Sequence, residues 1–295
     1  MERKTAHDFD QDLLILFDAY VHGALDRRGF LDKATKYAVG GVTAAMLLDQ
    51  LSPNFAEAQQ VSPEDKRLKI ERLPYPSPGG SEKTSGYLVR PANASGKLPS
   101  VLVIHENRGL NPHIEDIARR IALDGFMAFA PDALAQIGGY PGTEDEARTQ
   151  FQKLDRDKTN ADMTNAAAYL KARPDSTGKI GVVGFCWGGS QSHRLATVLP
   201  DLAASVPFYG GAPNPTEAPK VKAALLVQLA ENDAGVNKSW ATYEPALKEA
   251  GIKYEAHVYP GTSHGFNNDT TPRYDEKQAK IAWERTIAHF KKHLA

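Results

Sequence analysis

The sequence predicts an α/β protein with a mostly parallel central sheet that is covered by helices on both faces. Short apolar runs alternate with segments of helical spacing from about residue 99 to the end of the chain. The run at 99–105 is apolar almost throughout, which is typical of a strand buried on both faces of a parallel sheet. With 295 residues, 41% of them hydrophobic, the chain is long enough for one large domain with an appendage.

Local signals support the individual elements. Residues 67–75 and 86–90 are expected to form a hairpin around a turn rich in proline and glycine. The helix at 111–124 starts with an asparagine that can cap it and a proline in its first turn, and Thr143 is the expected cap of another helix. Further strands are expected at 99–105, 126–130, 179–183, 203–208, 223–230 and 254–259, and further helices at 158–173, 187–199, 238–250 and 275–293.

The only cysteine of the chain lies in a Gly-Phe-Cys-Trp-Gly-Gly turn at 184–189, between an apolar strand and a helix. A nucleophile on such a turn is held in a strained conformation, and the glycines beside it let the chain pass close by. The N-terminus of the following helix favours the thiolate form of Cys186. A lone cysteine is often only a small buried hydrophobic residue, but the turn around this one predicts a nucleophile.

Two partners for Cys186 follow in the order acid, then base. Asp233 comes just after the apolar run at 223–230, and His264 comes just after the run at 254–259. Because the carboxyl ends of parallel strands meet at one edge of a sheet, the sequence predicts a Cys186–His264–Asp233 triad. In this triad Asp233 orients His264, and His264 takes the thiol proton so that sulfur attacks an ester or lactone carbonyl.

No metal and no cofactor are expected. The other histidines, His22 among them, show no ligand spacing with carboxylates or with the cysteine, so we expect them to be surface or structural residues. A net charge of −1 and the lack of a stripe of basic and aromatic residues argue against a nucleic-acid partner.

With these motifs in place, residues 67–294 resemble the dienelactone hydrolase family, whose members have the α/β-hydrolase fold. The Gly-Phe-Cys-x-Gly-Gly turn and the later His-Gly-Phe carry the resemblance. It implies that Glu106 contacts the resting cysteine, where the carboxylate could accept the thiol proton. The alternative is a structural Glu106 that pairs with Arg108 or another cation. The resemblance and the topology also imply an oxyanion hole made by the backbone N–H groups of Asn107 and Trp187.

The chain departs from this family at its substrate-binding arginines. Members that act on dienelactone hold the substrate carboxylate with two arginines, but one matching position here is Asn268 and the loop at 133–140 has no arginine. We therefore expect a different ester or lactone, neutral or with a polar group placed elsewhere. Candidate residues of the substrate pocket, for which a core position is the alternative, are Tyr140, Phe208, Tyr209, Phe266 and Asn268.

Residues 1–58 are predicted to form an extension in front of a hydrolase domain at 59–295. A twin-arginine pair, a weakly apolar stretch at 37–48 and a small-x-small pattern at 56–58 resemble a Tat export signal with cleavage after Ala58. This predicts a periplasmic protein with the Tat translocase as a partner; without export the protein is cytoplasmic. The alternative, favoured by the amphipathic pattern at 10–17, is a helical hairpin that packs on the domain.

Two other functions fit parts of the sequence. A non-catalytic protein with this fold could bind or assemble through the extension, although an intact triad disfavours it. A redox-responsive protein could oxidise Cys186 to the sulfenic acid, but the chain has no second cysteine for a reversible intrachain switch. The oligomeric state is not predicted.

Overall fold

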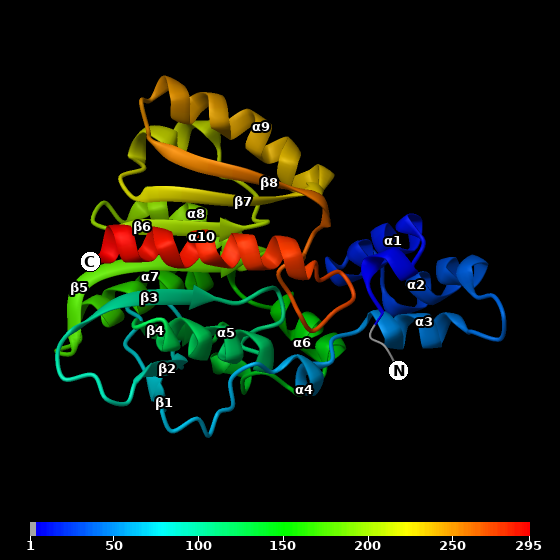
Figure 1. The fold of residues 1–295 in the computed structure, drawn as a ribbon, viewed down its shortest axis with the longest axis horizontal. Helices are drawn as coiled ribbons and strands as arrows, with labels where there is room; N and C mark the ends of the chain where they lie inside the picture. The colour runs from blue at the N-terminus through cyan, green and yellow to red at the C-terminus, as the bar shows by residue number, and fades with distance from the viewer. Residues whose placement is uncertain (1–3) are drawn as a thin grey trace.

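A computed structural model describes residues 4–295 and has an eight-stranded sheet at its centre (Figure 1). The strand order is β1-β2-β4-β3-β5-β6-β7-β8, with β2 antiparallel to β1 and β4 and all other neighbours parallel. The predicted mostly parallel sheet is therefore confirmed. The strands are β1 Leu68–Pro74, β2 Ser85–Pro91, β3 Leu98–Ile104, β4 Met127–Pro131, β5 Ser176–Phe185, β6 Ala204–Phe208, β7 Ala224–Asn232 and β8 Tyr254–Ser263.

Helices cover both faces of the sheet, and each face has its own apolar core. On one face lie α5 (Pro112–Leu123) and α10 (Glu276–Leu294); on the other lie α7 (Arg156–Ala172), α8 (Trp187–Val198) and α9 (Ala234–Glu249). Three- and four-residue spacing puts Ile114, Ile117 and Ile121 on one side of α5, where all three are fully buried. Burying each such side chain contributes about 2 kcal/mol. The remaining core elements are α6 (Glu144–Phe151), η3 (Ala135–Ile137) and η4 (Pro215–Lys220).

The N-terminal residues fold into a small helical unit with a third apolar core. Its elements are η1 (Ala6–Asp8), α1 (Gln11–Val21), α2 (Arg27–Ala34), η2 (Thr35–Tyr37), α3 (Ala44–Leu51) and α4 (Phe55–Ala58). Figure 1 shows these helices in blue, beside the end of the sheet to which the parallel strands point. The packed helical alternative for this segment is thus the arrangement that the structure has.

The features that resembled an export signal are parts of this folded unit. Asp26 caps α2, and Arg27 is the first residue of this helix. The side chain of Arg27 pairs with Asp145 of α6 at 3.1 Å. The stretch at 37–48 is divided between η2, a turn and α3, and Ala58 is buried. The Tat interpretation is therefore not supported. Among the helices of residues 4–295, none is long and apolar enough to cross a membrane.

Side chains of the hydrolase domain hold the last turn of α1. Arg108 Nη2 donates to the backbone oxygen of Val21 at 2.8 Å, and Arg148 Nη1 donates to that of Tyr20 at 2.5 Å. Arg273 pairs with Asp18 at 3.0 Å. Cationic side chains at a helix C-terminus donate hydrogen bonds to its unpaired carbonyl groups and interact favourably with the negative end of the helix dipole. The contacts fix the end of α1 against the strand ends of the sheet.

Candidate active site

Cys186 lies at the sharp turn between β5 and α8. Its backbone has φ 56° and ψ −113°, a conformation that costs a non-glycine residue about 1–3 kcal/mol. A Cβ on Gly184 would lie 2.0 Å from the carbonyl oxygen of Gly188, and a Cβ on Gly188 would lie 2.2 Å from that of Ile104. The glycines are thus required because three backbones meet at the turn. The predicted strained elbow is confirmed.

His264 and Asp233 come together from neighbouring strands. β7 ends at Asn232 and β8 ends at Ser263, so each of the two residues directly follows its strand. His264 Nδ1 lies 2.6 Å from Asp233 Oδ2, while Asp233 Oδ1 accepts a hydrogen bond from Val236 N as the cap of α9. Because Asp233 accepts a hydrogen bond from Nδ1, Nε2 is the ring nitrogen that faces the cysteine. His264 Nε2 is buried and has no hydrogen-bond partner among the described residues.

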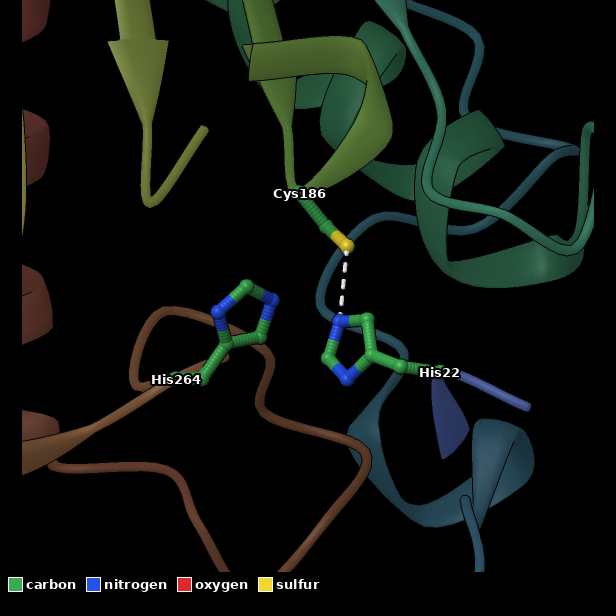
Figure 2. A group of neighbouring side chains, drawn as sticks. All are labelled: His22, Cys186 and His264. Atoms are coloured by element: carbon green, nitrogen blue, oxygen red, sulfur yellow. Dashed lines mark hydrogen bonds between the residues drawn. The ribbon is translucent and has the colours of Figure 1, made fainter. Parts of the chain in front are cut away.

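A second histidine reaches the sulfur, and it comes from the N-terminal unit. His22, the C-cap of α1, places its Nε2 3.4 Å from Cys186 Sγ (Figure 2). Its Nδ1 lies 2.9 Å from the backbone oxygen and 3.3 Å from the carboxylate of Asp18. The expectation that His22 is only a surface or structural residue was wrong. The amphipathic pattern at 10–17 predicted a packed helix, but no local signal told where that helix would dock.

The two histidines change the acidity of the thiol. Burial alone would raise the pKa of Cys186, but the charges of His264 and His22 outweigh it and lower the pKa to about 6. Burial would lower the pKa of His264, yet the sulfur and Asp233 raise it to about 9. Against the effect of burial, Cys186 and Asp18 likewise hold the pKa of His22 above its usual range. At neutral pH the site therefore contains a thiolate beside imidazolium groups.

Known proteins similar to this chain include hydrolases, which agrees with the geometry of the site. Residues 84–294 match the dienelactone hydrolase family. The chain belongs to that family. The prediction of a hydrolase with this fold is thus confirmed. Residues 1–39 match a different family, described as YqhI-like, rather than an export signal.

Individual relatives of this dienelactone hydrolase family member cover either part of the chain or most of its hydrolase domain. A "putative hydrolase fragment YghX" of Escherichia coli is 53% identical over 114 residues, which are 39% of this chain and 97% of that protein. A "putative carboxymethylenebutenolidase" of Salmonella typhi is 31% identical over 228 residues, covering 72% of this chain and 84% of that one. The crystal structure of a "putative dienelactone hydrolase" from Klebsiella pneumoniae matches with a TM-score of 0.66 and 30% identity, covering 76% of this chain and 99% of that one.

The residues expected to support the triad are near it, with different partners. Trp187 is the first residue of α8, so its N–H has no acceptor within the helix, and both Trp187 and Asn107 line the cavity beside Cys186. Glu106 accepts a hydrogen bond from Asn268 Nδ2 at 3.2 Å. Arg108, the suggested structural partner of Glu106, instead lies 3.5 Å from Glu144. The oxyanion hole and the contact of Glu106 with the cysteine stay predictions.

A cavity of about 820 Å³ opens in front of Cys186, His264 and His22. Of the five candidate pocket residues, Tyr209 lines this cavity. The structure places the other four elsewhere. Phe208, the last residue of β6, and Phe266, in the loop after β8, are fully buried in the same apolar core, with their ring centroids 6.3 Å apart. The polar groups of Tyr140 and Asn268 are used by Glu144 and Glu106.

Three arginines that no sequence motif singles out line the cavity. They lie on α6, α7 and α8 as Arg148, Arg156 and Arg194, whereas the family's arginines were sought in the loop at 133–140 and at position 268. None of the described residues that line this cavity is an aspartate or a glutamate. The cavity is therefore positively charged.

The His22→Gln variant is expected to have a less acidic Cys186 thiol. Glutamine removes a positive charge beside the sulfur, so the thiolate becomes less stable and its pKa rises from about 6. The rate of alkylation by iodoacetamide, measured against pH, should then shift to higher pH. The matched control is His7→Gln, which changes an exposed histidine of the same unit. An unshifted curve for His22→Gln would contradict the role of His22.

Proposed function

We propose that this protein hydrolyses carboxylic esters or lactones through a thioester on Cys186. The observation that carries the proposal is the strained elbow that presents Cys186 in front of His264, whose Nδ1 lies 2.6 Å from Asp233. A nucleophile, a base and a group that orients the base are the three parts that covalent acyl transfer requires.

Each residue has a definite part in the reaction. The Cys186 thiolate attacks the carbonyl carbon, and the N–H groups of Trp187 and Asn107 stabilise the oxyanion by about 3 kcal/mol per donor. Protonated His264 gives its proton to the leaving alkoxide and becomes a base. It then takes a proton from water, whose oxygen attacks the thioester carbon. Release of the acid leaves the thiolate beside imidazolium again.

The walls of the cavity favour a substrate with an acidic group. Arg194 donates to Thr164 Oγ1 at 3.2 Å, and no carboxylate of residues 4–295 lies within ion-pair distance of Arg194 or Arg156. Arg148, by contrast, is held by α1 and Asp145. Guanidinium groups without a carboxylate partner are suited to bind the carboxylate of an ester substrate. The proposed substrate is thus an anionic ester or lactone.

The Arg194→Gln variant is expected to raise KM for an anionic ester by about 10-fold or more, since a hydrogen bond to a charged group contributes about 1.5–3 kcal/mol. The measurement compares p-nitrophenyl hemisuccinate with neutral p-nitrophenyl acetate. KM for the neutral ester should stay unchanged, because it has no group for the guanidinium to bind. Equal changes for both esters would argue against recognition of the anion.

Trapping the acyl-enzyme tests the proposed function directly. The full-length protein is mixed with a panel of p-nitrophenyl esters, quenched in acid and weighed by mass spectrometry. We expect the acyl mass on the peptide with Cys186, its removal by neutral hydroxylamine, and its absence after treatment with iodoacetamide. Turnover that survives stoichiometric alkylation of Cys186 would contradict the mechanism.

A further inference from the structure

Three donor atoms from side chains that line the cavity lie close together (Figure 2). They are Nε2 of His22, Sγ of Cys186 and Nε2 of His264, and they all lie within 4.8 Å of one another. Figure 2 shows that the two imidazoles come from opposite sides, His22 from the end of α1 and His264 from the loop after β8. A thiolate and two imidazoles are the donors that zinc and similar transition metals prefer.

Both imidazoles are held in the tautomer that a metal needs. Nδ1 of His264 is engaged by Asp233, and Nδ1 of His22 is engaged by Asp18. Metal-binding histidines are commonly oriented in this way, by a carboxylate or a carbonyl oxygen on the other ring nitrogen. Each Nε2 therefore faces the sulfur, and once its proton passes to the solvent it offers a lone pair to a metal; His264 Nε2 has no hydrogen-bond partner in the described part of the chain.

The spacing requires only a small adjustment to reach a tetrahedral site. Bond lengths of about 2.3 Å to sulfur and about 2.0 Å to nitrogen place tetrahedral ligand atoms about 3.3–3.6 Å apart. His22 Nε2 and Cys186 Sγ are already 3.4 Å apart. The other pairs lie within 4.8 Å, so they have to close by at most about 1.5 Å. The His22 side chain is 32% exposed, so it has room to move. All three residues also line the large cavity, which leaves a fourth position open.

We propose that His22, Cys186 and His264 bind a divalent transition-metal ion of the zinc class, with a water molecule as the fourth ligand. One bond forms from the metal to sulfur and two form to nitrogen, and the protons that these atoms carried pass to the solvent. Donation of one lone pair to the metal lowers the nucleophilicity of the sulfur, and the ion occupies the space in front of it, so metal binding is expected to compete with thioester formation. That last consequence rests on the proposed function; the metal site does not.

The N-terminal unit makes this site different from an ordinary cysteine–histidine pair. Cys186 and His264 alone offer two ligands, and only the docking of α1 supplies the third. The site and its hydrogen bonds are built from four segments that are distant in the sequence. One carries both Asp18 and His22, and the other three carry Cys186, Asp233 and His264. Ligand spacing in the sequence could therefore not have predicted it.

Metal titration of the full-length, tag-free protein tests the site. We expect one Zn²⁺ per chain by calorimetry and a sulfur-to-cobalt charge-transfer band with Co²⁺ that Cys186→Ser abolishes. His22→Gln should weaken zinc binding by more than about 100-fold, because it removes a ligand, and Asp18→Asn by about 10- to 100-fold, as for an outer-shell partner. The matched control His7→Gln should bind zinc like the unmodified protein. Thermal melts check that each variant is folded.

Several results would overturn the metal site. They are the lack of saturable zinc binding, wild-type affinity in His22→Gln, and an unchanged rate of iodoacetamide alkylation in the zinc-loaded protein. Ester hydrolysis by the chelator-treated protein is measured in parallel, because it tests the proposed function alone. Zinc binding without any esterase activity would leave the metal site standing and would count only against the proposed function.

Discussion

The Cys186→Ala variant is expected to lower kcat for ester hydrolysis by at least about 10⁴-fold, since losing the nucleophile of a comparable triad costs about 10⁶-fold. The variant lacks the atom that bonds to the acyl group, and neither His264 nor His22 can replace it from its position. The backbone turn does not depend on sulfur, because close approach of neighbouring backbones at Gly184 and Gly188 fixes it. Alanine should therefore leave the melting temperature nearly unchanged.

The measurement is the steady-state rate with p-nitrophenyl esters, on protein whose folding has been checked by circular dichroism. Thr197→Ala is the matched control. Thr197 lies near the C-terminal end of α8, the helix that begins directly after Cys186, and its hydroxyl group donates to the carbonyl of Arg194. This variant should keep the wild-type kcat. A Cys186→Ala protein that still hydrolyses these esters at the wild-type rate would exclude the cysteine as nucleophile.

The catalytic triad could be predicted from the sequence because short local motifs identify each of its three residues. The elbow needs glycines at fixed positions around the nucleophile, and the base and acid each follow an apolar strand directly. Parallel strands then bring Cys186, Asp233 and His264 to one edge of the sheet, and this placement does not depend on the conformation of the loops. The strand and helix ranges were predicted for the same reason, with differences mostly at the element ends.

Two elements that carry site residues have ends that differ from the predicted ones, and contacts made at the site explain both differences. The helix expected at 238–250 starts instead at Ala234, because Asp233 caps it. The strand expected at 254–259 continues to Ser263, because its end pairs with Asn232 of β7 past a bulge. Apolar periodicity ends before both of these polar stretches, so it could not mark the true boundaries.

The part of the site that could not be predicted depends on contacts between distant segments. His22 reaches Cys186 because Arg108, Arg148 and Arg273 hold the end of α1, and no pattern around residue 22 encodes those contacts. The twin-arginine pair gave a wrong interpretation for a similar reason. In the folded chain Arg27 pairs with Asp145, a partner more than a hundred residues away.

The Asp233→Asn variant is expected to lower kcat by about 10⁴-fold, as in other triads, with little loss of stability. An asparagine side chain can donate a hydrogen bond to His264 Nδ1, which favours the tautomer with the proton on Nε2. That nitrogen then has no lone pair to form the thiolate–imidazolium pair or to take the proton of the attacking water. The fold should persist because asparagine caps helices as well as aspartate does, so the bond from Val236 N to the side chain of residue 233 is kept.

Comparing Asp233→Asn with Asp233→Ala separates the two roles of this residue. Alanine removes both the partner of His264 and the cap of α9, so it should also lower the free energy of unfolding by about 0.5–2 kcal/mol. The measurements are kcat for one ester and urea denaturation for both variants. Similar losses of kcat with unequal stabilities would assign the catalytic effect to the tautomer of His264. If Asp233→Asn kept its kcat, orientation of His264 by Asp233 would not matter for the reaction.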